Sequence, residues 1–340
     1  MLPVELYRGE DALRTDRERV IRRAWQFVGH VSQLAAPGDY RADVLGGAPV
    51  VVVRKADGEL AAFHNVCRHR AGALVADGAG NCGEVFTCRY HGWKYALDGR
   101  LRSAVDFGAL PGFDPRQYGL FPVRVETWRG LIFVNPDLAA APLADLVAPL
   151  DRRWATDQSA FPLVEARTHE IRCNWKAYVE NYLEGYHIGM VHPEFDADVV
   201  VADYRTEVDG EVIFGHAPQR DASIYGGLWA WLWPNMAINV YRHGYMVERM
   251  TAASPDRTRL DYFYFFDPAH TGDLPALFEF SDLVTAQDLQ VCEEVQRNLE
   301  AGVYQGGVLS PKHEQGVAWF QARIAEGLGL PKPPRLAAVG

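Results

Sequence analysis

The chain has 340 residues, of which 48% are hydrophobic and 23% are charged, and its net charge is −10. This length suits one large domain or two ordinary ones, and the composition is that of a soluble globular protein. The negative charge without a basic run excludes a nucleic-acid-binding surface, and no apolar stretch approaches the ~20 residues that cross a bilayer. The charged N-terminus does not look like a targeting peptide, and five thinly spread cysteines do not form a disulfide scaffold. We therefore expect a cytoplasmic protein with reduced thiols, some of them committed to a metal.

The predicted elements begin with a helical segment over the first ~30 residues, where apolar positions recur at helical spacing among charges. Residues 38–136 then change to short β-rich runs, with hairpin turns at Asp57-Gly58 and Asp98-Gly99. Many short strands with turn signals at this spacing indicate a small antiparallel sandwich. The expected division is into segments 1–32, 33–140 and 141–340.

The third segment mixes strands with long helices. Residues 175–195 fit a helix that is broken near His192-Pro193, several strands follow, and residues 276–302 form a long amphipathic helix that ends at Gly302. An antiparallel sheet around long helices makes the fold class α+β. The N-terminal helical segment is expected to pack on this second domain.

Two mixed cysteine–histidine pairs indicate a metal site in the sandwich. Cys67 and His69 form a Cys-x-His pair, and Cys88 and His91 form a Cys-x-x-His pair. Four such ligands fit structural zinc, but zinc fingers place the two cysteines in one pair and the two histidines in the other. A mixed pair on each of two hairpin tips would instead bind one iron through sulfur and a second through nitrogen, as in a Rieske [2Fe–2S] centre. Cys82, between the pairs, is treated as non-ligating.

The motifs CRHRAG at 67–72 and CRYHGWKY at 88–95 resemble those of the Rieske non-haem iron oxygenases. The resemblance implies an N-terminal Rieske β-sandwich domain whose [2Fe–2S] cluster is held by the two cysteines and two histidines. It also implies a C-terminal catalytic domain of the helix-grip type, similar to START and Bet v1 proteins, with a mononuclear Fe(II).

A second metal site is expected in the C-terminal half. His187 and His192 are close enough in sequence to converge on one ion at a bent helix end, and Glu184 lies one turn before His187. The third ligand of a 2-His-1-carboxylate triad is an acidic residue. On pattern alone, four acidic residues of the long C-terminal helix compete for this role: Asp282, Asp288, Glu293 and Glu294.

The resemblance places the third iron ligand at Asp288. It places Glu184 at the position of the family's acidic bridge between the cluster of one subunit and the mononuclear iron of the next, where many members have Asp. It further implies a head-to-tail homotrimer that oxidises a small molecule with O₂. Electrons would come from NAD(P)H through a separate flavin and iron–sulfur reductase, because this chain has no G-x-G-x-x-G fingerprint. A Rieske electron carrier or binding protein is the alternative, and neither would need the second iron.

Two features of the sequence bear on the identity of the substrate: a strand rich in tryptophan, and a resemblance to one branch of the family. Trp229, Trp231 and Trp233 alternate along a strand and share one face, where they either pack the core or, with Asn235, line the pocket. Aromatic walls suit a planar ring or a quaternary ammonium group. The sequence ENYLEGYH and the C-terminal helix resemble the branch of choline, glycine betaine and proline betaine monooxygenases. This implies monooxygenation or N-demethylation of a small quaternary ammonium compound; the alternative is hydroxylation or O-demethylation of an aromatic compound.

Overall fold

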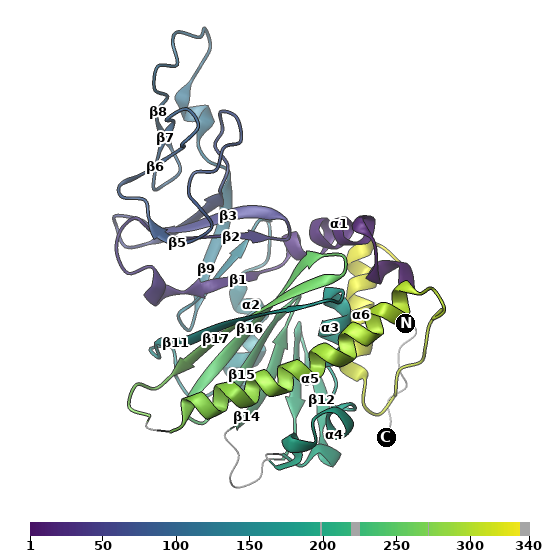
Figure 1. Cartoon of the computed structure of the whole chain (residues 1–340). Coiled ribbons are helices and arrows are strands. Elements are labelled where there is room, and N and C mark those ends of the chain that lie inside the picture. The colour runs from purple at the N-terminus through teal and green to yellow at the C-terminus, as the bar shows by residue number, and fades with distance from the viewer. Residues whose placement is uncertain (198, 219–224, 271, 334–340) are drawn as a thin grey trace. The chain divides into compact units, whose positions relative to one another are not determined.

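The computed structural model describes residues 1–197, 199–218, 225–270 and 272–333, and the chain divides into two units (Figure 1). One unit is Ile21–Leu143, and the other combines Met1–Val20 with Ala144–Gly340. The divisions thus fall after Val20 and Leu143, where the sequence predicted them after residues 32 and 140. The first difference arises because strand β1 (Gln26–His30) pairs with β10 (Leu131–Asn135) and so joins the sandwich.

The unit Ile21–Leu143 is the expected antiparallel sandwich. A seven-stranded sheet has the order β1-β10-β9-β4-β3-β2-β5, and a three-stranded sheet has the order β6-β7-β8. Both predicted hairpin turns join neighbouring strands, β3 to β4 and β7 to β8. The remaining elements of this unit are β2 (Asp39–Leu45), β3 (Ala48–Arg54), β4 (Leu60–His64), β5 (Gly78–Asn81), β6 (Val85–Thr87), β7 (Lys94–Ala96), β8 (Leu101–Ser103), β9 (Pro122–Trp128), and the short 3₁₀ helices η2 (Ile21–Arg23), η3 (Val31–Gln33) and η4 (Pro115–Tyr118).

Strand β3 carries four consecutive valines, residues 50–53, and each is at most 2% exposed. Successive side chains of a strand point to opposite faces, so the four valines pack into two different hydrophobic cores. Val51 and Val53 pack in the core that also contains Cys67 and Cys88. Val50 and Val52 pack in a separate cluster with residues of β1, β2, β4, β9 and β10 of the same sheet. A strand covered on both faces thereby supports the loops that carry the cysteine–histidine pairs.

The second unit contains a seven-stranded antiparallel sheet of order β11-β17-β16-β15-β14-β13-β12. The long helix α5 (Leu274–Glu300) lies against this sheet (Figure 1). The hydroxyl groups of Tyr264 and Tyr262 in β17 form hydrogen bonds with Ser281 and Thr285 of the helix. The predicted α+β class is confirmed. The remaining elements of this unit are β11 (Leu163–Ile171), β12 (Arg205–Asp209), β13 (Val212–His216), β14 (Tyr225–Leu232), β15 (Met236–Tyr241), β16 (Gly244–Ser254), β17 (Arg257–Phe266), α1 (Glu10–Arg19), α2 (Leu143–Arg153), α3 (Trp175–Tyr182), α4 (Ile188–Val191), α6 (Gln315–Leu328), η1 (Val4–Tyr7), η5 (Pro193–Ala197) and η6 (Val201–Asp203).

A buried ion pair holds helix α1 to helix α3. Lys176 is 0% exposed and Asp16 is 1% exposed, and the ammonium group contacts the carboxylate. The indole N–H of Trp175 donates a second hydrogen bond to Asp16, at 2.9 Å. Burial lowers the pKa of Lys176, and the Asp16 charge opposes that shift. The N-terminal helix α1 therefore fixes α3, the helix that precedes residues 183–187.

The helix predicted over 175–195 has the expected break at His192-Pro193, because α4 ends at Val191 and the 3₁₀ helix η5 begins at Pro193. It also has a second break that was not predicted, since α3 ends at Tyr182 and α4 begins only at Ile188. The Glu184 carboxylate accepts hydrogen bonds from the backbone N–H groups of Tyr186 and His187, which removes them from a continuous helix. Within the described ranges, no helix is both long and apolar enough to span a bilayer.

Candidate metal centres

Two loops of similar geometry carry the cysteine–histidine pairs of the sandwich. In the first, the N–H of Ala71 donates to the carbonyl of Cys67 at 3.0 Å; in the second, the N–H of Gly92 donates to the carbonyl of Cys88 at 2.9 Å. Ala71 and Gly92 both have a positive φ, 56° and 70°. Each loop is thus a tight turn that starts at a cysteine and places the following histidine at its tip.

The four side chains of these loops gather into one group. Cys67 and Cys88 are each 2% exposed, and burial together with the neighbouring Cys67 thiol raises the pKa of Cys88. The rings of His69 and His91 lie with their centroids 4.5 Å apart. The Nδ1 atom of His69 is buried and has no hydrogen-bond partner among the described residues. A buried ring nitrogen without a partner, beside two buried thiols, fits the donor set of a Rieske cluster.

Neighbouring side chains hold this group in place. His69 stacks on Trp93 with 4.9 Å between ring centroids and 6° between ring planes. The hydroxyl of the buried Tyr95 lies 3.2 Å from Cys67 Sγ and accepts a hydrogen bond from the N–H of Arg68 at 3.0 Å. Hydrogen bonds to cluster sulfur are one way in which proteins adjust reduction potential. The thiol of Cys82 donates to the Gly38 carbonyl at 3.3 Å and takes no part in the group.

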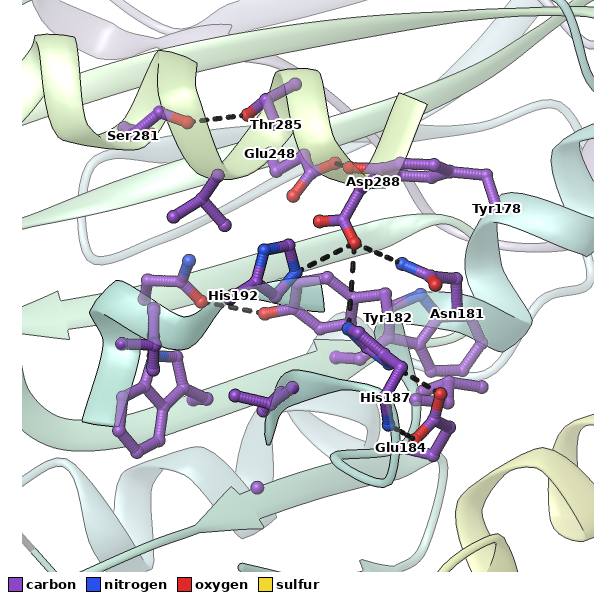
Figure 2. A pocket seen from close by; sticks show the side chains of 18 of the residues that line it. Tyr178, Asn181, Tyr182, Glu184, His187, His192, Glu248, Ser281, Thr285 and Asp288 are labelled. Carbon is purple, nitrogen blue, oxygen red and sulfur yellow. Dashed lines mark hydrogen bonds and ion pairs between the residues drawn. The ribbon is translucent and has the colours of Figure 1, made fainter. Parts of the chain in front are cut away.

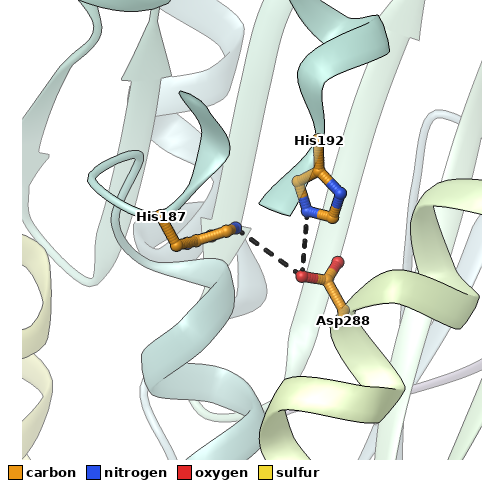
Figure 3. A group of neighbouring side chains, drawn as sticks. All are labelled: His187, His192 and Asp288. Carbon is orange, nitrogen blue, oxygen red and sulfur yellow. Dashed lines mark hydrogen bonds and ion pairs between the residues drawn. The ribbon is translucent and has the colours of Figure 1, made fainter. Parts of the chain in front are cut away.

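The second group lies where the loop after α3 faces helix α5. One ligand atom from each of His187, His192 and Asp288 lies within 4.8 Å of the others (Figure 3). Asp288 Oδ1 is 3.0 Å from His192 Nε2 and 3.6 Å from His187 Nε2. Two imidazoles and one carboxylate converge in this way at facial-triad iron sites, which leaves other coordination positions open.

Each of the three side chains is oriented by a further residue; Figure 2 shows this for His187, which contacts Glu184, and for Asp288, which contacts Asn181. Glu184 lies 2.6 Å from His187 Nδ1, and the Gln287 amide oxygen lies 2.7 Å from His192 Nδ1. These bonds place the ring protons on Nδ1 and direct both Nε2 atoms toward Asp288. The Asn181 amide donates to Asp288 Oδ1 at 2.8 Å. Burial opposes a charge on His192, but the hydrogen bond and charge of Asp288 outweigh it and raise the His192 pKa.

The three competing acidic residues of α5 are engaged elsewhere. Asp282 forms an ion pair with Arg167. Glu293 pairs with Arg172 at 3.0 Å, and the exposed Glu294 lies 3.8 Å from Arg297. Sequence reasoning missed Asn181 and Gln287, although each lies close in sequence to a residue it did identify. In the sequence both look like ordinary polar residues of a helix, and only the fold brings their side-chain amides next to the triad.

A cavity of about 130 Å³ opens beside the triad. Trp229 and Trp231 line it, whereas the predicted pocket residues Trp233 and Asn235 do not. Strand β14 ends at Leu232, so the alternation that put the three tryptophans on one face stops before Trp233. The Trp233 ring packs against Trp231, Trp319 and Phe320, under Arg323, and the Asn235 amide donates to the Met250 carbonyl at 2.8 Å.

The cavity wall also contains a buried carboxyl group that sequence reasoning missed. Glu248 of β16 is 2% exposed and accepts a hydrogen bond from the Tyr178 hydroxyl at 2.8 Å. Burial raises the pKa of Glu248 to about 8, with a further contribution from the Asp288 charge. The only sequence signal was the charged pair Glu248-Arg249 in the middle of the mostly apolar run YMVERM.

Comparisons with known proteins agree with this geometry. Residues 24–114 match the family described as Rieske [2Fe-2S] domain, and residues 160–329 match ring hydroxylating alpha subunit (catalytic domain). The carnitine monooxygenase oxygenase subunit of Escherichia coli K12 is 31% identical, with 96% of this chain and 93% of the relative covered. The chloroplastic choline monooxygenase of Beta vulgaris is 29% identical, over 92% of this chain and 73% of the relative. The solved structure of a quaternary ammonium Rieske monooxygenase, described for carnitine oxidation and inter-subunit electron transfer, superposes with a TM-score of 0.85 at 28% identity, covering 96% and 94% of the two chains.

Proposed function

Because this chain belongs to the Rieske-type ring-hydroxylating oxygenase family, with a Rieske [2Fe–2S] domain and a mononuclear iron domain, we propose that it oxidises the N-methyl or adjacent carbon of a small quaternary ammonium compound. The family's enzymes are oxygenases that take small-molecule substrates and receive electrons from a reductase. The observation that carries the proposal is the aromatic-lined cavity directly beside the convergent His187, His192 and Asp288. Relatives that act on carnitine and on choline support the same substrate class.

In this proposal His187, His192 and Asp288 hold the mononuclear iron, and Cys67, His69, Cys88 and His91 hold the cluster. The bound iron supplies activation of O₂ for insertion into a C–H bond. Glu184 and Gln287 keep both imidazoles in the tautomer that presents Nε2. The small cavity holds the substrate carbon next to the triad and limits the water that can enter with it. A hydroxylated N-methyl group then breaks its C–N bond and leaves as formaldehyde.

We further propose that electrons cross from the cluster of one subunit to the mononuclear iron of a neighbour in a head-to-tail homotrimer, with Glu184 as the bridge. The inter-subunit transfer described for the quaternary ammonium monooxygenase supports this arrangement. Glu184 already binds His187 Nδ1 through one oxygen. Its other oxygen binds the backbone N–H groups of Tyr186 and His187, so the carboxylate is fixed in orientation before any partner histidine arrives.

Replacing Glu184 with alanine is expected to lower the turnover rate by about 10–100-fold, the usual cost of losing a partner of a metal-bound histidine. Both iron sites should remain loaded, and the reduced cluster should be reoxidised more slowly when substrate and O₂ are added, as followed by its visible absorbance. Glu184→Gln keeps an acceptor for His187 Nδ1 and should retain iron more tightly than Glu184→Ala. Unchanged turnover in Glu184→Ala would rule out the bridging role.

The substrate class is tested by turnover with the reconstituted reductase system. With quaternary ammonium compounds we expect matched O₂ consumption and release of formaldehyde from an oxidised N-methyl group, or of the tertiary amine and a larger aldehyde from an oxidised adjacent carbon. We expect no product from aromatic acids or aryl methyl ethers. Iron and acid-labile sulfide analysis of the same preparation should show one more iron per chain than an electron carrier with only the cluster. Oxidation of an aromatic compound in place of the ammonium compounds would contradict the proposal.

A further inference from the structure

We propose that the cavity selects a substrate with a net positive charge, an ammonium alcohol or alkylammonium ion rather than a zwitterionic betaine, and that Glu248 is the residue that makes this selection. The inference rests on the proposed function and narrows its substrate class. Relatives of this chain include enzymes for both types, because carnitine carries a carboxylate and choline does not. The question is therefore which type this cavity fits.

Apart from His187 and His192, the ionisable side chains that line the cavity among the described residues are acids and tyrosines. Three carboxyl groups line it, those of Glu184, Glu248 and Asp288, and no lysine or arginine is among the described lining residues. A ferrous ion held by the triad would offset Asp288 and Glu184. Glu248 has no cation beside it among the described lining residues, and burial keeps its carboxyl group largely protonated until a cationic ligand stabilises the ionised form. The carboxylate of a betaine would have to leave water and lie in the same small cavity without a basic partner, which is unfavourable. A cation without a carboxylate would instead provide the missing positive charge.

The surroundings of Glu248 do not by themselves require a carboxyl group. The Tyr178 hydroxyl donates a hydrogen bond to Glu248 (Figure 2). The Tyr178 oxygen also lies 3.3 Å from the hydroxyl of Tyr262, which in turn lies 3.0 Å from Thr285 Oγ1. A glutamine would accept the Tyr178 hydrogen bond equally well. It would also avoid the larger cost of burying an ionisable group at a position that is 2% exposed. An acidic side chain at this place is accounted for by a positively charged ligand.

Other residues that line the cavity fit the methylated ammonium group and the hydroxyl group of such a ligand. The rings of Tyr182, Trp229 and Tyr241 line the cavity and can attract a methylated ammonium group through their faces. The indole N–H of Trp231, which is 0% exposed, has no hydrogen-bond partner in the described part of the chain. A hydroxyl oxygen on the ligand would satisfy that buried donor without bringing in a negative charge.

Calorimetric titration of the iron-loaded oxygenase without O₂ distinguishes the effect of ligand charge on affinity from the effect of ligand shape. The ligands are choline, glycine betaine and the neutral isostere of choline in which a tert-butyl group replaces the trimethylammonium group. We expect choline to bind at least about tenfold more tightly than either of the others, which corresponds to ~1.4 kcal/mol. In Glu248→Gln, choline affinity should fall by at least about tenfold, while the affinity for the neutral isostere stays the same.

Glu170→Gln, on the exposed surface of β11 in the same sheet, is the matched control and should bind choline as the unsubstituted protein does. Thermal melting and iron content of Glu248→Gln establish that the variant is folded and loaded. Glycine betaine binding as tightly as choline, or unchanged choline affinity in Glu248→Gln, would overturn the inference and leave the proposed function standing. If no ammonium compound binds and an aromatic compound is oxidised, the proposed function fails with it.

Discussion

Replacing Asp288 with alanine is expected to remove the mononuclear iron and to lower oxygenase activity by more than about 100-fold, the upper loss typical of residues that only support a metal ligand. In the proposed site Asp288 would provide the only carboxylate ligand, and its Oδ1 atom lies 3.0 Å from His192 Nε2 and 3.6 Å from His187 Nε2. Two neutral histidines alone bind Fe(II) weakly. Metal analysis should show one iron fewer per chain with unchanged acid-labile sulfide, and the visible absorbance of the cluster should persist.

Glu294→Ala is the control for this experiment. Glu294 lies on the same helix, is exposed, and competed with Asp288 in the sequence pattern. Its replacement should leave iron content and activity unchanged. Full iron content in Asp288→Ala, or loss of iron in Glu294→Ala, would assign the third ligand to a different residue.

Replacing Cys88 with serine is expected to abolish the cluster and, with it, all reductase-dependent turnover. The Cys88 thiol lies in the sandwich core, 2% exposed, beside Cys67 and the unpartnered nitrogen of His69. A serine oxygen at this position is a poor ligand for a cluster bound by thiolates. Visible absorbance and acid-labile sulfide should both disappear, while the mononuclear iron should stay bound, because its proposed ligands belong to the other structural unit.

Cys82→Ser is the control for this experiment. It distinguishes the loss of a cluster ligand from the general effect of removing a thiol from this unit. Cys82 lies in the same loop region, but its thiol bonds to the Gly38 carbonyl. The variant should keep its absorbance and its activity. Cys67→Ser should repeat the result of Cys88→Ser, and loss of zinc instead of sulfide from either variant would favour the zinc alternative.

Glu184 combines a structural and a proposed chemical role, and this explains why the helix breaks where it does. The same carboxylate accepts two backbone N–H groups of the following loop and binds His187 Nδ1 at 2.6 Å. The turn that ends α3 is therefore also the turn that presents His187 to Asp288. The Glu184 side chain is long enough to reach both the backbone N–H groups and the imidazole.

The features that could be predicted from the sequence alone are those that depend on residues close together in the chain. The two cysteine–histidine pairs, the Asp-Gly hairpin turns and the long amphipathic helix could all be predicted, because each rests on contacts between residues close together in the chain. The same holds for the pairing of His187 with His192 around one bend. The family resemblance then added the fold of the second unit and the choice of Asp288, which the pattern on the helix left open among four acidic residues.

The tertiary structure decided what depends on distant segments. It engaged Asp282 and Glu293 with arginines of other elements and brought Asp288, about a hundred residues away in sequence, to the histidines. It ended β14 before Trp233 and so removed that ring from the cavity wall. It also placed Glu248 there, in a strand whose sequence predicts only burial. Such side chains acquire a role from the sheet register and from the packing of helix on sheet, and neither is contained in local spacing.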